Sequence, residues 1–222
     1  SINFIECLFN QYYIIDMNNA DLKNLIHKQK LNFSLDQEFY VNQDIFDLDI
    51  KNIFSKQWVF VGHISRIPNY GDYFLFNIGK ESIIIVRDKD NSVHAHYNVC
   101  RHRGSHICLE NEGNSKVLIC PYHAWTYNLD GSLKGARLMD KDFNKNDWHL
   151  HKCNSKIFEG LIFINLSEHP NDFEEFIAPT KKFIEFHGLE DAKIAHRQYY
   201  PTEGNWKLTL DNFHECYHCQ PS

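Results

Sequence analysis

The chain has 222 residues, 43% of them hydrophobic and 14% aromatic, which is enough for one large domain or for one domain and part of another. Its formal net charge of −6 gives no electrostatic reason to expect a nucleic acid or an anionic membrane as a partner. The longest apolar runs, such as Ile83–Val86, are strand-sized and far shorter than the roughly 18 residues of a membrane span, so we expect a soluble protein.

The N-terminus shows no basic stretch followed by an apolar core and a cleavage site, so no secretory signal is predicted. The seven cysteines include two in Cys-x-His and Cys-x-x-His pairs, which favours metal binding over disulfides and a cytoplasmic location. Met17 opens a plausible start, so residues 1–16 are expected to be an upstream or non-native extension. The chain stops at Ser222, directly after a cluster of metal-binding side chains, so we expect a fragment.

Residues 17–56 are predicted to be a helical lead-in, because apolar residues from Leu48 to Trp58 recur at helical spacing. From Trp58 onward the pattern changes to short strands, and Asp130-Gly131 supplies a hairpin turn. The predicted strands are 58–61, 73–78, 82–87, 93–98, 117–120, 125–128 and 160–166. Strands this short and closely spaced indicate an antiparallel β-sandwich over residues 57–168.

The pattern changes again after residue 168. Residues 171–187 are predicted to be helical with a break at Pro179, because proline removes a backbone donor. Residues 193–200 and 206–210 alternate like strands, and 211–219 resemble the start of a helix. We therefore expect an α+β chain in which a second domain begins at residue 169 and continues to residue 222.

Two mixed pairs of metal ligands lie in the predicted sandwich. Cys100 and His102 form one pair, and Cys120 and His123 form the other, on two separate loops. Such loops can hold a [2Fe–2S] cluster, with both thiolates on one iron and both imidazoles on the other. Gly104 lets the backbone turn close to the cluster.

A tetrahedral zinc site is the alternative, because two cysteines and two histidines also satisfy zinc. Zinc sites of this composition usually pair like with like, whereas each loop here mixes one cysteine with one histidine. His106 and Cys108 lie in the first loop and could be rival ligands. We expect them instead to pack beside the cluster or to face solvent.

A second group of polar residues runs from Asn205 to His218 near the end of the chain. On a helix, Glu215 and His218 are three residues apart and share one face, so His218 can bind iron while Glu215 reaches outward from the same site. A lone Glu-x-x-His is a weak signal. The preceding Asn-Trp-Lys and Asp-Asn sequences, together with the cluster motif upstream, strengthen it.

These motifs resemble the large (alpha) subunits of the Rieske non-haem iron oxygenases, whose signature is Cys-x-His, about seventeen residues, then Cys-x-x-His. The resemblance covers about residues 35–222 and implies a Rieske domain followed by the start of an α+β, helix-grip-like catalytic domain. By position, His218 is implied as a ligand of mononuclear Fe(II). Glu215 is implied as the carboxylate that links this iron to the Rieske histidine of a neighbouring subunit.

The chain ends before the second histidine and the carboxylate ligand of that iron. One ligand cannot hold ferrous iron, so we expect the 222 residues alone to be inactive.

The resemblance further implies a homotrimer that takes electrons from an NAD(P)H-dependent reductase, with or without a ferredoxin, and uses O2 to hydroxylate a small molecule. Glu215, where ring-hydroxylating dioxygenases usually have aspartate, favours the subgroup that acts on quaternary amines such as glycine betaine, carnitine, choline and stachydrine. Hydroxylation of an aromatic ring is the alternative substrate class. A Rieske electron carrier and an inert, truncated gene product are further alternatives; the Asn205–His218 run argues against the carrier, which needs no second iron ligand.

Overall fold

The computed structural model describes residues 20–140 and 142–214, which form two compact units. One unit is Ser55–Arg197, and the other joins the described residues up to Phe54 to those from Gln198 onward. The domain boundaries predicted at residues 17, 57 and 169 stay predictions. No helix in the described part of the chain is both long and apolar enough to cross a membrane.

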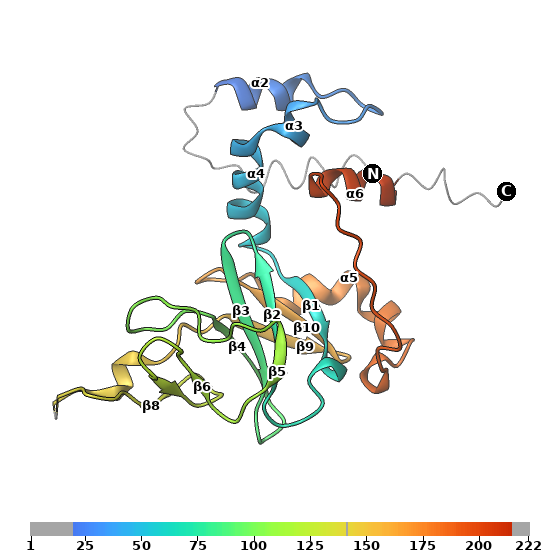
Figure 1. Ribbon diagram of the computed structural model, residues 1–222. Coiled ribbons are helices and arrows are strands. Elements are labelled where there is room, and N and C mark those ends of the chain that lie inside the picture. The colour runs from blue at the N-terminus through green and yellow to red at the C-terminus, as the bar shows by residue number, and fades with distance from the viewer. Residues whose placement is uncertain (1–19, 141, 215–222) are drawn as a thin grey trace. The chain divides into compact units, whose positions relative to one another are not determined.

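The unit Ser55–Arg197 is built on three antiparallel sheets (Figure 1). The first contains β1 (Val59–His63), β10 (Leu161–Asn165) and β9 (Asn154–Phe158), in that order. The second runs β4 (Val93–Tyr97), β3 (Glu81–Arg87), β2 (Asp72–Ile78) and β5 (Glu112–Asn114). The third is small and consists of β6 (Leu118–Ile119), β7 (Thr126–Tyr127) and β8 (Leu133–Gly135). The predicted α+β class with an antiparallel sandwich is confirmed.

Strand β3 is buried on both faces, which explains its continuous apolar run. Successive side chains of a strand point to opposite faces. Ile83 and Ile85 enter the core that includes residues of β1 and β10, whereas Ile84 and Val86 enter a second core. That second core also contains both predicted cysteine ligands. The four-stranded sheet therefore separates the sandwich core from the core beneath the cluster loops.

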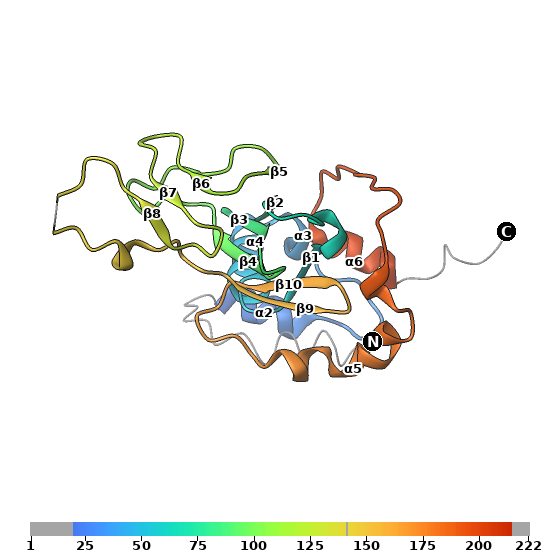
Figure 2. The same ribbon diagram turned by 90° about the horizontal axis from the view of Figure 1, so that it is seen from below.

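A helix covers the face of the three-stranded β1-β10-β9 sheet that points away from the sandwich core (Figure 2). This is α5 (Phe173–Glu185), whose Phe173 and Ile177 pack against Trp58 and Phe163. The predicted break at Pro179 is wrong, because the helix is continuous through that residue. Packing of its apolar face on the sheet outweighs the one backbone hydrogen bond that proline removes.

Three short 3-10 helices complete this unit: η2 (Ile64–Arg66), η3 (Lys145–Trp148) and η4 (Leu189–Asp191). The strand predicted over residues 193–200 is absent, and these residues have no regular structure. All of them are exposed, although Arg197 pairs with Glu112 at 2.9 Å. An alternating pattern forms a strand only where a sheet edge accepts its backbone hydrogen bonds.

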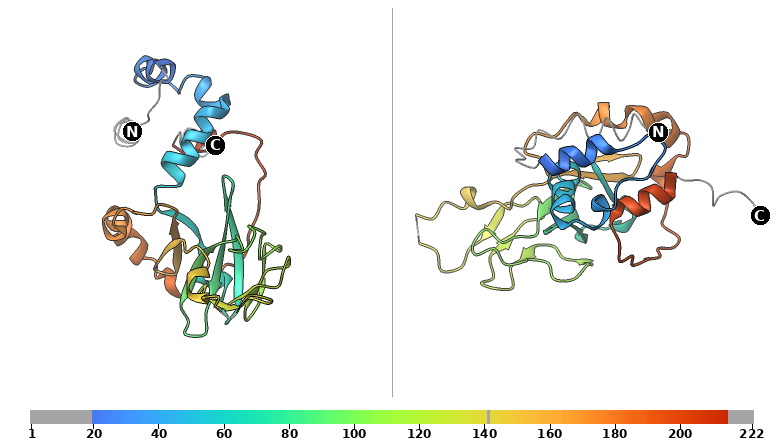
Figure 3. Two further views of the ribbon diagram at one scale, coloured as in Figure 1. Left: turned by 90° about the vertical axis from the view of Figure 1, so that its left-hand side faces the viewer. Right: turned by 90° about the horizontal axis from the view of Figure 1, so that it is seen from above.

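The other unit is helical in its described part (Figure 3). It contains α2 (Ala20–Lys28), α3 (Glu38–Val41), α4 (Gln43–Asp49), the π-helical turn η1 (Ile50–Phe54) and α6 (Trp206–His214). Leu22, Phe39 and Ile45 form a small core between the first helices. The strand predicted over residues 206–210 is wrong, since these residues begin α6.

Candidate metal centre

The first cluster loop leaves β4 and is fastened at its two ends by one buried side chain. The Asn98 Oδ1 atom accepts hydrogen bonds from the backbone N–H groups of Ile107 and Cys108, both at 2.9 Å. The Asn98 Nδ2 atom donates to the Cys108 carbonyl at 2.8 Å. These bonds satisfy backbone groups that would otherwise be buried without partners. Asn98 therefore closes the loop that carries Cys100 and His102.

Within the first loop, the backbone forms a tight turn around Cys100. The Cys100 N–H donates to the Ser105 carbonyl at 2.8 Å, and the Gly104 N–H donates to the Cys100 carbonyl at 2.9 Å. Gly104 has φ of +72°, a left-handed conformation that costs glycine little. The predicted role of Gly104 in turning the backbone agrees with this geometry.

The second loop repeats the same turn around Cys120. Its N–H donates to the Trp125 carbonyl at 2.8 Å, and the Ala124 N–H donates to the Cys120 carbonyl at 3.0 Å. Ala124 occupies the position equivalent to Gly104 and has φ of +57°, although an alanine side chain is disfavoured there. The two loops differ in sequence, but the backbone forms the same turn around each cysteine.

The two predicted cysteine ligands lie together in the core. Cys100 and Cys120 are each 2% exposed, and their thiols are within hydrogen-bond reach of each other. Burial raises the pKa of the Cys100 thiol, and the Tyr127 hydroxyl opposes that rise. The Tyr127 hydroxyl lies 3.3 Å from the Cys100 Sγ atom and accepts a hydrogen bond from the Arg101 N–H at 3.1 Å. Burial raises the pKa of Tyr127 well above its usual value, so its hydroxyl stays protonated and can donate to sulfur.

The two predicted histidine ligands also lie together, with His102 half-buried and His123 exposed. The ring centroids of His102 and His123 are 4.7 Å apart. His102 stacks on buried Trp125 at 4.9 Å, and His123 lies 3.9 Å from the Tyr122 ring. Partial desolvation, together with the charges of His123 and Arg103, lowers the pKa of His102. A neutral imidazole is the form that binds metal.

This donor set divides into a pair of thiols and a pair of imidazoles, which fits a [2Fe–2S] cluster with one pair on each iron. In the described part of the chain, no three His, Cys, Asp or Glu side chains are close enough to share a single metal ion. The Tyr127 hydroxyl beside the Cys100 sulfur also suits a thiolate ligand.

The two rival ligands in the first loop, His106 and Cys108, differ in exposure. His106 is exposed, whereas Cys108 is buried in the core beneath the loops. Burial raises the pKa of Cys108 to about 12, and its thiol contacts the side chain of Tyr73. Cys108 is therefore a protonated residue of the core beneath the loops.

Glu215 and His218, which the sequence predicts for the mononuclear iron, lie outside the described residues. The last described helix, α6, ends at His214, directly before Glu215 in the sequence.

Asn98 and Tyr127 support the site together with Trp125, but those two residues were not singled out from the sequence. Trp125 and Tyr127 stand two and four residues after His123, so their nearness to the motif was the available signal. Asn98 carried a weaker signal, as a polar residue at the end of a predicted strand.

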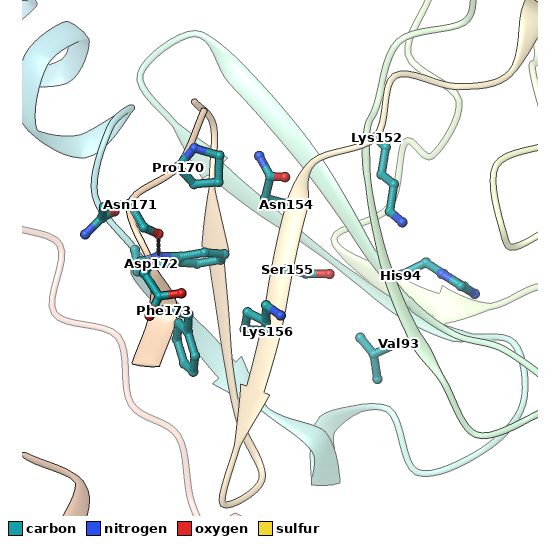
Figure 4. Close-up of a pocket in the computed structure, with 11 residues that line it drawn as sticks. Val93, His94, Lys152, Asn154, Ser155, Lys156, Pro170, Asn171, Asp172 and Phe173 are labelled. Atoms are coloured by element: carbon teal, nitrogen blue, oxygen red, sulfur yellow. Dashed lines mark hydrogen bonds between the residues drawn. The ribbon is translucent and has the colours of Figure 1, made fainter. Parts of the chain in front are cut away.

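One surface cavity lies away from these loops, between β9 and the start of α5 (Figure 4). Its volume is about 440 Å³, and none of the four candidate ligands lines it. Lys152 and His94 lie on one side of the cavity, and Asp172 lies on the other. The Asp172 carboxylate accepts a hydrogen bond from the Glu175 N–H and so caps α5.

Comparison with known proteins places two family models on the chain. Residues 57–154 match the Rieske [2Fe–2S] domain, and residues 189–222 match the ring hydroxylating alpha subunit (catalytic domain). The glycine betaine monooxygenase oxygenase subunit of Pseudomonas aeruginosa is 38% identical over 200 residues, covering 90% of this chain and 47% of that protein. The chain spans about half the length of the curated relatives that it matches.

Solved structures also match the chain. A quaternary ammonium Rieske monooxygenase, studied for carnitine oxidation and inter-subunit electron transfer, is 35% identical with a TM-score of 0.76. The match covers 83% of this chain and 52% of that one. Naphthalene 1,2-dioxygenase from Rhodococcus sp. is 31% identical with a TM-score of 0.78, covering 86% and 46%.

The family models and these relatives agree with the paired thiols and imidazoles of the two loops. The chain belongs to the family of Rieske non-haem iron oxygenase large (alpha) subunits.

Proposed function

We propose that this chain is part of the terminal oxygenase component of a Rieske oxygenase that hydroxylates, and thereby N-demethylates, a quaternary amine such as glycine betaine. The observation that carries the proposal is the pair of matching turns, which bring together two buried thiols and, beside each other, two imidazoles. The Asn205–His218 run supplies the second half of the argument, since an electron carrier alone needs no further iron ligand.

In this proposal Cys100 and Cys120 hold one iron of the cluster, and His102 and His123 hold the other. The cluster supplies one-electron storage, and mononuclear Fe(II) supplies O2 activation. Burial of both cysteines excludes water from the sulfur side, and the Tyr127 hydroxyl donates to the Cys100 thiolate. His123 is exposed and His102 is half-buried, so a partner can approach the imidazole side of the site through His123.

His218 is proposed as one ligand of the mononuclear iron, and Glu215 as the carboxylate that links this iron to the Rieske histidine of a neighbouring subunit. Such iron sites use two histidines and one carboxylate, so the full-length protein must supply the other two ligands. We also propose a homotrimer and an NAD(P)H-dependent reductase, with or without a ferredoxin, as the source of electrons. The four described cysteines are free, which suits a reducing, cytoplasmic setting.

The first test concerns the cluster. The 222-residue chain, purified anaerobically, is expected to contain about two irons and two acid-labile sulfides and to bleach with dithionite. Cys100→Ser and His123→Ala should each abolish the cluster, whereas His106→Ala, in the same loop, should keep it. One zinc ion without sulfide would contradict the proposal.

The second test concerns the substrate, for which aromatic ring hydroxylation is the alternative because the catalytic family model is that of ring-hydroxylating subunits. The full-length enzyme with a reductase and NADH should consume O2 with glycine betaine or carnitine and release formaldehyde from the N-methyl group. Benzene and naphthalene serve as matched probes of the alternative. A diol product from either, without formaldehyde from the amines, would favour ring hydroxylation. Absence of any third iron per chain would favour the electron carrier.

A further inference from the structure

Helix α6 is the last described element before the proposed mononuclear iron residues. It ends at His214, and Glu215 and His218 follow in the sequence. The position of α6 therefore fixes the point from which the chain continues to these residues. Apolar packing alone does not account for this position, because Leu208 of α6 is 49% exposed.

Polar contacts from the N-terminal helices hold the start of α6 instead. The Asp49 carboxylate, at the end of α4, accepts hydrogen bonds from the Trp206 indole N–H at 3.1 Å and from the Lys207 ammonium group. Both charged side chains are buried, with Asp49 0% exposed and Lys207 4%. Phe54 packs edge-on against the Trp206 ring at 5.0 Å. Replacing one partner of a buried ion pair is costly, because the other charge then stays buried without a partner. The pair therefore holds the start of α6 against the end of α4.

A second polar contact lies one turn further along α6. The Tyr40 hydroxyl, on α3, donates to the Asp211 carboxylate at 2.6 Å. Lys207 and Asp211 are four residues apart and so lie on one face of the helix. Two directional contacts a turn apart restrict both sliding along the helix axis and rotation about it, which apolar contacts do not.

We propose that Asp49 and Tyr40 are positioning residues for the mononuclear iron, acting through Lys207, Trp206 and Asp211 on α6. The inference rests on the proposed function, in which His218 binds that iron. It assigns the N-terminal segment 38–54 to the mononuclear iron site, although 157 residues separate Asp49 from Trp206. Groups that orient a metal ligand affect metal affinity without touching the metal.

The test uses the full-length enzyme with its cluster loaded and its mononuclear site emptied by a chelator. Co(II) alone is then titrated in, and its absorption bands report both affinity and coordination geometry. Asp49→Asn should weaken Co(II) binding about tenfold and change the bands at saturation, while the Rieske spectrum and sulfide content stay normal. Asp47→Asn removes an exposed carboxylate from the same helix and should change neither quantity.

Tyr40→Phe removes a single hydroxyl group and keeps the test decisive if Asp49→Asn does not fold. Like Asp49→Asn, it should weaken Co(II) binding and change the absorption bands at saturation. A purely structural role would lower the unfolding temperature of either variant but leave the saturated bands of the folded protein unchanged. That result would overturn the inference.

His218→Ala separates this inference from the proposed function. Normal Co(II) binding in His218→Ala would show that the proposed iron ligand is wrong. Loss of binding in His218→Ala, with wild-type affinity and bands in both Asp49→Asn and Tyr40→Phe, would leave the function standing and reject the positioning role.

Discussion

Tyr127 links the two cluster loops through one hydroxyl group. It lies on β7, directly after the second loop, yet its hydroxyl contacts the Arg101 N–H and the Cys100 sulfur of the first loop. A hydrogen bond to a thiolate stabilises the more negative, reduced cluster in preference to the oxidised one. Tyr127 is therefore expected to tune the reduction potential rather than to hold iron.

Replacing Tyr127 with phenylalanine should lower the reduction potential by about 60 mV, the one-electron equivalent of about 1.4 kcal/mol. Iron and sulfide content should not change. A dithionite titration followed by visible absorption measures the potential. Tyr122→Phe, which removes a hydroxyl from an exposed residue beside His123, is the control and should keep the wild-type value. Equal potentials in Tyr127→Phe and the wild type would contradict the assigned role.

Ala124 adopts a backbone conformation that glycine adopts in the equivalent turn of the first loop. Left-handed alanine costs about 1–2 kcal/mol, and glycine loses about 0.5–1 kcal/mol more conformational freedom on folding. Ala124→Gly should therefore raise the free energy of unfolding by roughly 0.5–1 kcal/mol, without loss of cluster. Anaerobic urea denaturation tests this.

Ala178→Gly supplies the control for that prediction, because residue 178 lies within α5 and is exposed. There the same substitution should destabilise the protein by about 1 kcal/mol. Destabilisation at both positions would mean that the turn at residue 124 is not strained.

At the scale of elements, the first cluster loop depends on the strand that precedes it. Asn98 follows β4 and makes three hydrogen bonds to Ile107 and Cys108 at the far end of the loop. Asn98→Ala leaves two buried N–H groups without a partner and should lower the free energy of unfolding by about 3 kcal/mol. Cluster content should fall with it, because the loop is no longer closed.

Chemical denaturation and iron analysis of the same preparation check both effects. Asn77→Ala, on the exposed side of β2, should change stability by less than about 0.5 kcal/mol and keep the cluster. A stable Asn98→Ala protein with a full cluster would show that the loop closes without this side chain.

At the scale of the whole molecule, Glu215 is proposed to join metal sites of two subunits in the full-length enzyme. Glu215→Gln keeps the size of the side chain but removes the charge that orients two histidines. The variant should keep its Rieske spectrum and its mononuclear iron, yet lose most turnover. Mixing pre-reduced variant with O2 and substrate, and following cluster reoxidation, tests this. Product formation coupled to reoxidation at the wild-type rate would refute the bridging role.

The sequence alone determined the cluster motif and the class of fold. Cys100, His102, Cys120 and His123 stand at fixed short spacings, so each loop had to present one sulfur and one nitrogen whatever surrounded it. The short apolar runs predicted strands because alternation and run length are local properties, as Ile83–Val86 shows. Local chemistry of this kind needs no knowledge of distant segments.

Tertiary structure decided what depends on a partner far along the chain. Trp206, Leu208 and Leu210 alternate as in a strand, but the segment is helical and buries Lys207 against Asp49 instead. Pro179 stays within a helix because its neighbours pack on a sheet. The roles of Asn98 and Tyr127 emerged in the same way, from contacts that no spacing encodes. A buried charge, or a hydrogen bond that closes a loop, is stable only when its partner is present. Only the folded chain brings such distant partners together.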